Sequence, residues 1–231
     1  MDARFKLGKG LSLIVVCLFS ADWATAQTAL KDATTYFERA VAYAEKGHLD
    51  QAISDFSKAL EINARYAEAY TGRGVAYERK GQYDQAISDH SKALEINPTH
   101  AGAYTNRGTA YERKGQYDQA ISDFTRALEI NPRDAEAYTD RGVAYASKGQ
   151  YEQAIFNYTK ALEINPKFAK AYLNRGIANS NKRQYDQAIS DYSTALEINP
   201  RYVEAYYQRG DRKSTRLNSS HIQKSRMPSS A

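Results

Sequence analysis

The side chains that could carry out chemistry are few and scattered. His48, His90 and His100 stand far apart, and no motif combines closely spaced histidines or a histidine with a cysteine, as metal sites do. Serine and acidic residues are common, but their spacing singles out no nucleophile with a base. No glycine-rich phosphate loop follows a strand pattern. The sequence therefore predicts no enzyme, no metal site and no cofactor.

The only cysteine, Cys17, lies in a short apolar run near the N-terminus. The run follows a cationic stretch and precedes Ala24-Thr25-Ala26, which matches the small-residue pattern of signal peptidase cleavage. Residues 1–26 are therefore predicted to be a signal peptide, because the run is short for a membrane span. The cleaved chain would have no thiol, which excludes disulfides and cysteine chemistry. We expect an exported protein, in the bacterial periplasm or secreted, without a membrane association after cleavage.

The net charge of +5 is located at the two ends of the chain. Residues 1–26 and residues 211–231 carry the whole excess of positive charge, and the residues between them are neutral in sum. A protein that binds nucleic acid needs a basic surface to contact phosphates. No nucleic-acid partner is expected, because the body of the chain lacks such a surface.

The chain from residue 33 to residue 210 follows a period of 34 residues. The second and third rows of this period differ at only 8 of 34 positions. Within a row, apolar and small residues recur at helical spacing in two segments, so each row predicts two helices. Lys80-Gly81 ends the first segment of the second row, and Asn97-Pro98 ends the second. The five full rows, called repeats 1 to 5 below, are 33–66, 67–100, 101–134, 135–168 and 169–202, and a partial sixth is 203–210.

This pattern resembles the tetratricopeptide repeat (TPR) family. The resemblance rests on an aromatic residue at row position 4, a small residue at position 8, alanines at positions 20 and 27, and a proline at position 32. In repeat 2 these residues are Tyr70, Gly74, Ala86, Ala93 and Pro98. The resemblance implies an all-α fold, a right-handed superhelical solenoid of antiparallel helix pairs, over residues 27–210.

Two row positions depart from the family pattern. Position 7 is arginine in every row, and position 23 is aspartate in every full row except the fourth, which has Asn157. We expect an Arg–Asp ladder that joins the two helices of a repeat or adjacent repeats, weakest at Asn157. Repeat 5 has Asn179 and Arg183 where tyrosine and glycine are usual, so its first turn is expected to be strained or loosely packed.

Aromatic residues are unusually frequent, with 19 tyrosines. Most of them occupy positions 4, 11 and 17, which are packing positions, so we interpret them as core residues rather than as an aromatic binding surface. His90 stands where other repeats have Phe56 and Phe124. We interpret it as a core substitution rather than as a ligand.

The family resemblance implies that the first helices line a concave groove that binds a protein or a peptide. The groove positions here are mixed in polarity and nearly neutral, and they lack the Lys and Asn with which carboxylate-clamp members hold a peptide's C-terminus. We therefore predict binding by shape and polar complementarity; a solvated face without a ligand is the alternative. The candidate groove residues are Thr71, Val75, Glu78, Arg79, Thr105, Asn106, Thr109, Glu112, Arg113, Thr139, Asp140, Val143, Asn174 and Ile177.

Residues 211–231 break the period. The stretches "DRKSTRLNSSH" and "SRMPSSA" can be back-translated, in order and in frame, into parts of a widely used sequencing adapter. We interpret residues 211–231 as a non-native tail, with a natural disordered basic tail as the alternative, and expect the native chain to continue past Gly210. Two alternative functions follow: a TPR portion of a larger exported protein, such as an enzyme or an assembly factor, and a self-associating structural array.

Overall fold

The computed structural model describes the backbone of residues 31–225 and the side chains of residues 31–214. The predicted signal peptide, residues 1–26, lies outside the described residues, as do residues 226–231 of the predicted tail. The chain divides into two compact units, residues 1–98 and residues 99–231, and each is described by itself.

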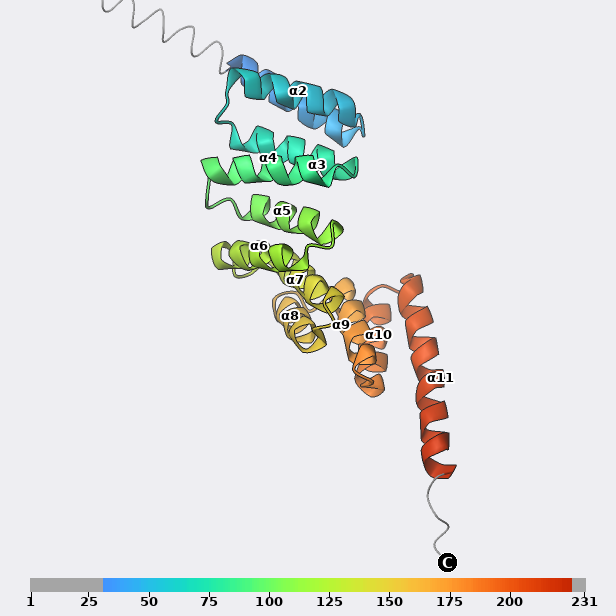
Figure 1. Ribbon diagram of the computed structural model, residues 1–231. Helices are drawn as coiled ribbons and strands as arrows, with labels where there is room; N and C mark the ends of the chain where they lie inside the picture. The colour runs from blue at the N-terminus through green and yellow to red at the C-terminus, as the bar shows by residue number, and fades with distance from the viewer. Residues whose placement is uncertain (1–30, 226–231) are drawn as a thin grey trace, which may run out of the picture. The chain divides into compact units, whose positions relative to one another are not determined.

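The first unit consists of helices that pack one against the next. A helix over residues 31–45 is followed by α2 (Leu49–Ile62), α3 (Ala67–Arg79) and α4 (Tyr83–Ile96). Helix α2 packs on α3, and α3 packs on α4 (Figure 1). Helices α3 and α4 begin and end where the repeat pattern predicts, with Lys80 capping α3 and Asn97 capping α4.

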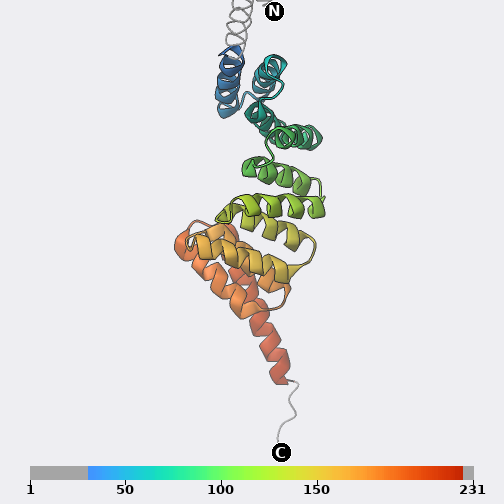
Figure 2. The same cartoon turned by 90° about the vertical axis from the view of Figure 1, so that its left-hand side faces the viewer.

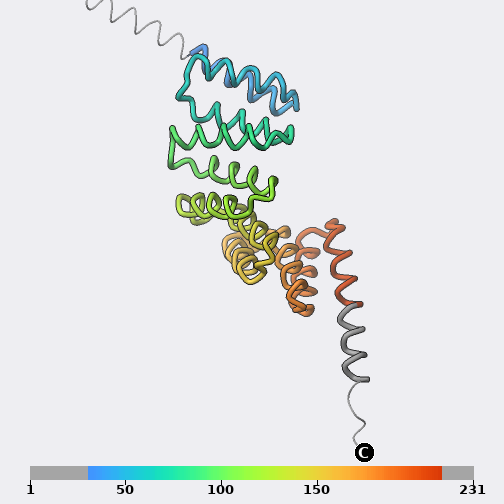
Figure 3. Tube along the Cα trace, viewed as in Figure 1, coloured from blue at the N-terminus to red at the C-terminus, as the bar shows by residue number. Residues whose placement is uncertain are grey.

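The second unit continues the same arrangement. Each helix packs against the next one, and the first helices of neighbouring repeats also touch, as α5 does α7 and α7 does α9. The trace therefore turns back at every connection (Figure 3), and α8, α9 and α10 lie side by side in the turned view (Figure 2). The helices are α5 (Ala101–Arg113), α6 (Tyr117–Ile130), α7 (Ala135–Ser147), α8 (Tyr151–Ile164), α9 (Ala169–Asn181), α10 (Tyr185–Ile198) and α11 (Val203–Ser225).

The described residues 31–225 contain helices and turns but no strand. The prediction of an all-α solenoid of antiparallel helix pairs is confirmed. Helix α11 continues past Gly210 to Ser225, so the first part of the predicted tail is helical. The interpretation of residues 211–231 as non-native stays a prediction.

The turn between the two helices of a repeat needs a residue whose backbone adopts the left-handed conformation, with positive φ. Repeats 1 to 4 place a glycine there, with φ between 73° and 81°, as at Gly149. Repeat 5 places Arg183 there, with φ of 61°. A side chain with a Cβ adopts this conformation at a cost, so the strain expected in the first turn of repeat 5 is confirmed.

The core consists of alanines, one leucine at position 28 and one large ring per repeat. These rings occupy position 24, and each is fully or almost fully buried: Phe56, His90, Phe124, Tyr158 and Tyr192. The ring of repeat 3 lies on a glycine, because a Cβ at Gly108 would stand 2.8 Å from Phe124. His90 occupies the same place in repeat 2, as expected of a core substitution.

The tyrosines at positions 4, 11 and 17 do not form this core. They are half-buried in repeats 2 to 5, and Tyr206 at the end of the array is 49% exposed. They pack against the buried clusters, as Tyr111, Tyr138 and Tyr151 do, so their interpretation as packing residues rather than as a binding surface is supported.

Candidate functional site

An Arg–Asp ladder connects the helices of the array. In repeat 3, Arg107 on α5 donates from Nε and Nη2 to the two carboxylate oxygens of Asp123 on α6, at 2.7 and 2.8 Å. The carboxylates are buried and the pairs are bidentate, which makes them strong contacts. The ladder predicted from the sequence is confirmed within single repeats. Its pairs are Arg39–Asp55, Arg73–Asp89, Arg107–Asp123 and Arg175–Asp191.

Two of these arginines also contact the preceding repeat. Arg73 donates from Nη1 to Ser57 at 2.9 Å, and Arg175 donates to Thr159 at 3.2 Å. Each guanidinium also lies over the tyrosine three residues earlier, as Arg107 does over Tyr104 at 5.7 Å from the ring centre. One arginine thus ties together three helices.

The ladder is interrupted in repeat 4. Arg141 donates from Nε to Asn157 Oδ1 at 2.8 Å and from Nη1 to Thr125 at 3.1 Å, but it forms no ion pair with the described residues. The hydrogen bonds that Arg107 donates to Asp123 raise the pKa of Arg107, whereas burial lowers the pKa of Arg141. The expectation that the ladder is weakest at Asn157 is therefore confirmed.

The candidate groove residues lie on the first helices of repeats 2 to 5. In the first unit they are all on α3; in the second unit they are on α5, α7 and α9. Most are half-buried and thus partly open to a partner. Thr139 is fully buried and donates its hydroxyl to the carbonyl of Ala135, so it cannot contact a partner. Arg79 donates to the carbonyl of Ala44, within the first unit.

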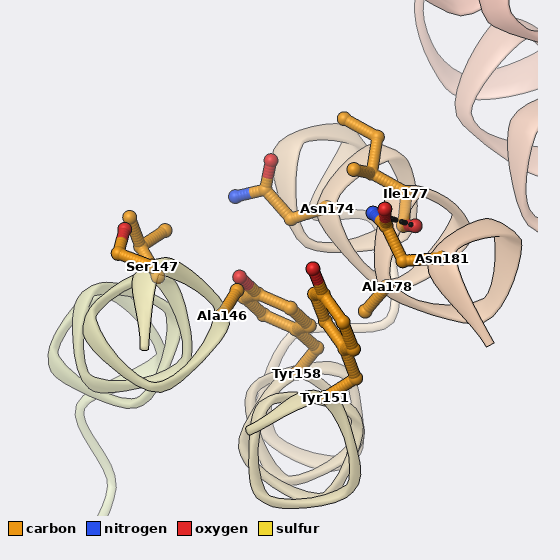
Figure 4. Close-up of a pocket in the computed structure, with 9 residues that line it drawn as sticks. Ala146, Ser147, Tyr151, Tyr158, Asn174, Ile177, Ala178 and Asn181 are labelled. Carbon is orange, nitrogen blue, oxygen red and sulfur yellow. Dashed lines mark hydrogen bonds between the residues drawn. The ribbon is translucent and has the colours of Figure 1, made fainter. Parts of the chain in front are cut away.

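A pocket of about 290 Å³ collects three of the candidates in the second unit. Val143 on α7 faces Asn174 and Ile177 on α9, and α8 contributes Tyr151 and Tyr158. In Figure 4 both tyrosine hydroxyls point into the space between α7 and α9. Tyr158 is only 2% exposed, yet its hydroxyl reaches this space. The pocket thus has apolar walls and neutral polar groups.

The pocket opens where repeat 4 carries small residues. Repeats 2 and 3 have Glu-Arg at positions 12 and 13, whereas repeat 4 has Ala146 and Ser147, which line the pocket. The groove positions implied by the resemblance did not include the two tyrosines from the second helix. The change from Glu-Arg to Ala-Ser was the sequence signal that could have indicated the pocket.

Carboxylates border this region. Burial raises the pKa of Glu112 and that of Asp140 above their usual values, and Asp140 keeps a loose ion pair with Lys170 at 3.5 Å. Burial, with the nearby charges of Asp140 and Glu112, also raises the pKa of the Tyr158 phenol. The three groups therefore lie within electrostatic reach of one another.

Comparison with known proteins defines the family. Tetratricopeptide repeat models match residues 40–81, 65–133, 135–168 and 169–202. A crystal structure of MamA is 30% identical, with a TM-score of 0.66, over 71% of this chain and 96% of that one. The chain belongs to the tetratricopeptide repeat family.

Two further solved structures are similar. YrrB, described as a TPR protein with an unusual peptide-binding site, is 27% identical with a TM-score of 0.66 over 79% of this chain and 96% of that one. The first TPR of Spaghetti (RPAP3), bound to the HSP90 peptide SRMEEVD, is 26% identical with a TM-score of 0.50 over 51% and 93%. A search of curated proteins found no match.

The described part of the chain adds two observations. No three of its His, Cys, Asp or Glu side chains gather closely enough to hold a metal ion. None of its helices combines the length and apolar character needed to cross a membrane.

Proposed function

We propose that this protein is an exported scaffold that binds a protein or a peptide along the first helices of its repeats, without catalysis. The observation that carries the proposal is the pocket between α7, α8 and α9. Its apolar walls and neutral hydroxyl and amide groups suit a peptide side chain held by shape and hydrogen bonds. The peptide-binding descriptions of YrrB and of the RPAP3 repeat support the same kind of partner.

The groove can be tested by closing this pocket with the protein's own sequence. The double variant Ala146→Glu with Ser147→Arg gives repeat 4 the residues that repeats 2 and 3 carry at the same positions, so we expect it to fold. Peptides selected from a random library on the wild-type protein should bind this variant about tenfold more weakly, a loss of about 1.4 kcal/mol. Fluorescence anisotropy with labelled peptides measures the difference.

The matched control is Gln187→Glu, which adds a charge at an exposed position of α10. It should leave the affinity unchanged. If no library peptide binds the wild-type protein, or if the pocket-closing variant binds the selected peptides equally well, the proposed groove is wrong.

A further inference from the structure

A second surface of repeat 4 differs from its counterparts. At positions 22 and 23, repeats 1, 2, 3 and 5 have Ser-Asp, whereas repeat 4 has Phe156-Asn157. The two changes are adjacent: one removes the buried carboxylate of the ladder, and the other places a large apolar ring on the surface. None of the candidate groove residues lies on this surface.

Phe156 is the most exposed large apolar side chain of repeats 1 to 5, at 57%. Its only described ring contact with a charge is Lys160, whose ammonium lies 5.8 Å from the ring centre. At the same position the other repeats have an exposed serine, so the fold does not need an aromatic residue there. An exposed ring that does not serve packing is typical of a contact surface.

Arg141 lies beside this ring with an incomplete set of partners. In repeat 3, Nη2 of Arg107 donates to Asp123 at 2.8 Å. In repeat 4, the Nη2 group of Arg141 has no hydrogen bond to a described residue, because Asn157 presents a single oxygen and turns its amide to the carbonyl of Gln153 at 2.7 Å. A half-buried guanidinium therefore retains both a free donor and its charge.

Phe156, Asn157 and Arg141 line one open cavity of about 510 Å³. Among the described residues that line the cavity, none offers an unpaired carboxylate to the charge of Arg141. Glu152 also lines it, but its carboxylate is paired with Lys182 at 2.7 Å. Lys160 is likewise paired, with Glu163 at 2.6 Å. The cavity thus combines one unpaired cation with one exposed aromatic ring.

We propose that this cavity binds an acidic side chain of a partner peptide, whose carboxylate accepts a hydrogen bond from the free Nη2 group of Arg141 while a neighbouring apolar side chain packs on Phe156. In the other four repeats, an aspartate carboxylate pairs with the arginine equivalent to Arg141. A charge-assisted hydrogen bond from Nη2 supplies specificity for a carboxylate, and the ring supplies apolar contact area. The site is separate from the proposed groove and does not depend on it.

The test uses a labelled, doubly capped peptide, acetyl-Gly-Leu-Glu-Phe-Gly-amide, and its counterpart with Gln in place of Glu. The full chain should bind the Glu peptide at least tenfold more tightly than the Gln peptide. Asn157→Asp restores the internal pair and should reduce the affinity for the Glu peptide at least tenfold. Phe156→Ser should reduce it several-fold. Both variants carry residues found at the same position in other repeats, so both are expected to fold, which circular dichroism verifies.

Further arms separate the alternatives. The groove variant Ala146→Glu with Ser147→Arg should bind the Glu peptide like the wild-type protein, so that a failed groove and a failed cavity are distinguishable. Equal binding of the Glu and Gln peptides, or unchanged binding by Asn157→Asp, would overturn the proposal. Tighter binding of an uncapped Gln peptide would assign the cavity to a C-terminal carboxylate instead. A dimer in sedimentation that Asn157→Asp dissociates would assign it to a second copy of the chain.

Discussion

Repeats 3 and 4 have the same helices but different surfaces. The first helices, α5 and α7, both have 13 residues, and the second helices, α6 and α8, both have 14. In repeat 3 the ladder is closed by Asp123 and the groove positions carry Glu112 and Arg113. In repeat 4 the ladder is open and the groove has a pocket.

Repeats 3 and 4 share the residues that pack their helices and differ in residues that give each repeat its own surface. Alanines, the position-24 ring and the glycine beneath it recur in both repeats and fix the helix packing. Ala146, Ser147 and Phe156 stand at half-buried or exposed positions, and Asn157 replaces a buried carboxylate. Two pairs of substitutions therefore change which side chains line the two cavities of repeat 4, while its helices keep the lengths of those in repeat 3. Function in a repeat protein is best sought where the period fails.

The largest expected effect on stability distinguishes Phe124 in repeat 3 from Phe156 in repeat 4. Phe124→Ala removes a fully buried ring and should lower the free energy of unfolding by about 3–5 kcal/mol. Phe156→Ala should change it by less than about 0.5 kcal/mol, because the ring is mostly exposed. Urea denaturation followed by circular dichroism measures both. Similar losses for the two variants would contradict the distinction between core ring and surface ring.

The second largest effect concerns the ladder arginines of repeats 3 and 4, whose replacement should cost different amounts of stability. Arg107→Met leaves the buried Asp123 carboxylate without its partner and should cost about 3 kcal/mol. Arg141→Met leaves only the neutral Asn157 and should cost about 1 kcal/mol. Hydrogen exchange by mass spectrometry should show the faster opening in α5 and α6 for the first variant. Equal costs would mean that the missing carboxylate in repeat 4 has no energetic consequence.

The turns of repeats 4 and 5 offer a reciprocal pair. Arg183→Gly removes the backbone strain of an arginine with positive φ and should stabilise the protein by about 1 kcal/mol. Gly149→Arg introduces the same strain into repeat 4 and should destabilise it by about as much. Thermal denaturation of both variants provides the measurement, and a shift of the same sign in both would refute the strain.

The smallest effect concerns the groove carboxylate Asp140. Burial raises its pKa, so the folded state holds its proton more tightly than the unfolded chain does. Its contribution to stability is fully present below the unfolded pKa of about 3.9 and is lost as the pH rises through the folded pKa. Asp140→Asn should therefore stabilise the protein at pH 7, by less than about 1 kcal/mol, and give no gain below about pH 3.9. Denaturation midpoints from pH 3 to pH 8 test the sign.

The period of the sequence predicted the helices, their ends and the ladder, because each depends on residues that recur at fixed spacing. Arg183 was also predictable, since its turn requires a left-handed residue. The site was predictable only in part. Thr139 is buried although Thr71 and Thr105, at the same row position, are half-buried, so the row position alone does not determine exposure.

The pocket tyrosines escaped prediction for a related reason. Tyr151 and Tyr158 belong to a second helix, whereas the groove implied by the resemblance is lined by first helices. Their hydroxyls become accessible because Ala146 and Ser147 leave space in front of them. The 34-residue period identifies equivalent positions in each repeat. The space around such a position depends on neighbouring side chains, and these differ from repeat to repeat.

The packing of each helix on its immediate successor has a consequence for how the protein is made. Within residues 99–225, each helix touches the next one, and the first helices of neighbouring repeats also touch, so native contacts join residues close in sequence. Loops of this length close at little entropic cost, and chains with such local contacts fold rapidly. Each helix pair can therefore pack as soon as it leaves the ribosome, on the repeat made just before it. When a new repeat packs, its ladder arginine can donate to the serine or threonine of the preceding repeat, which has already folded.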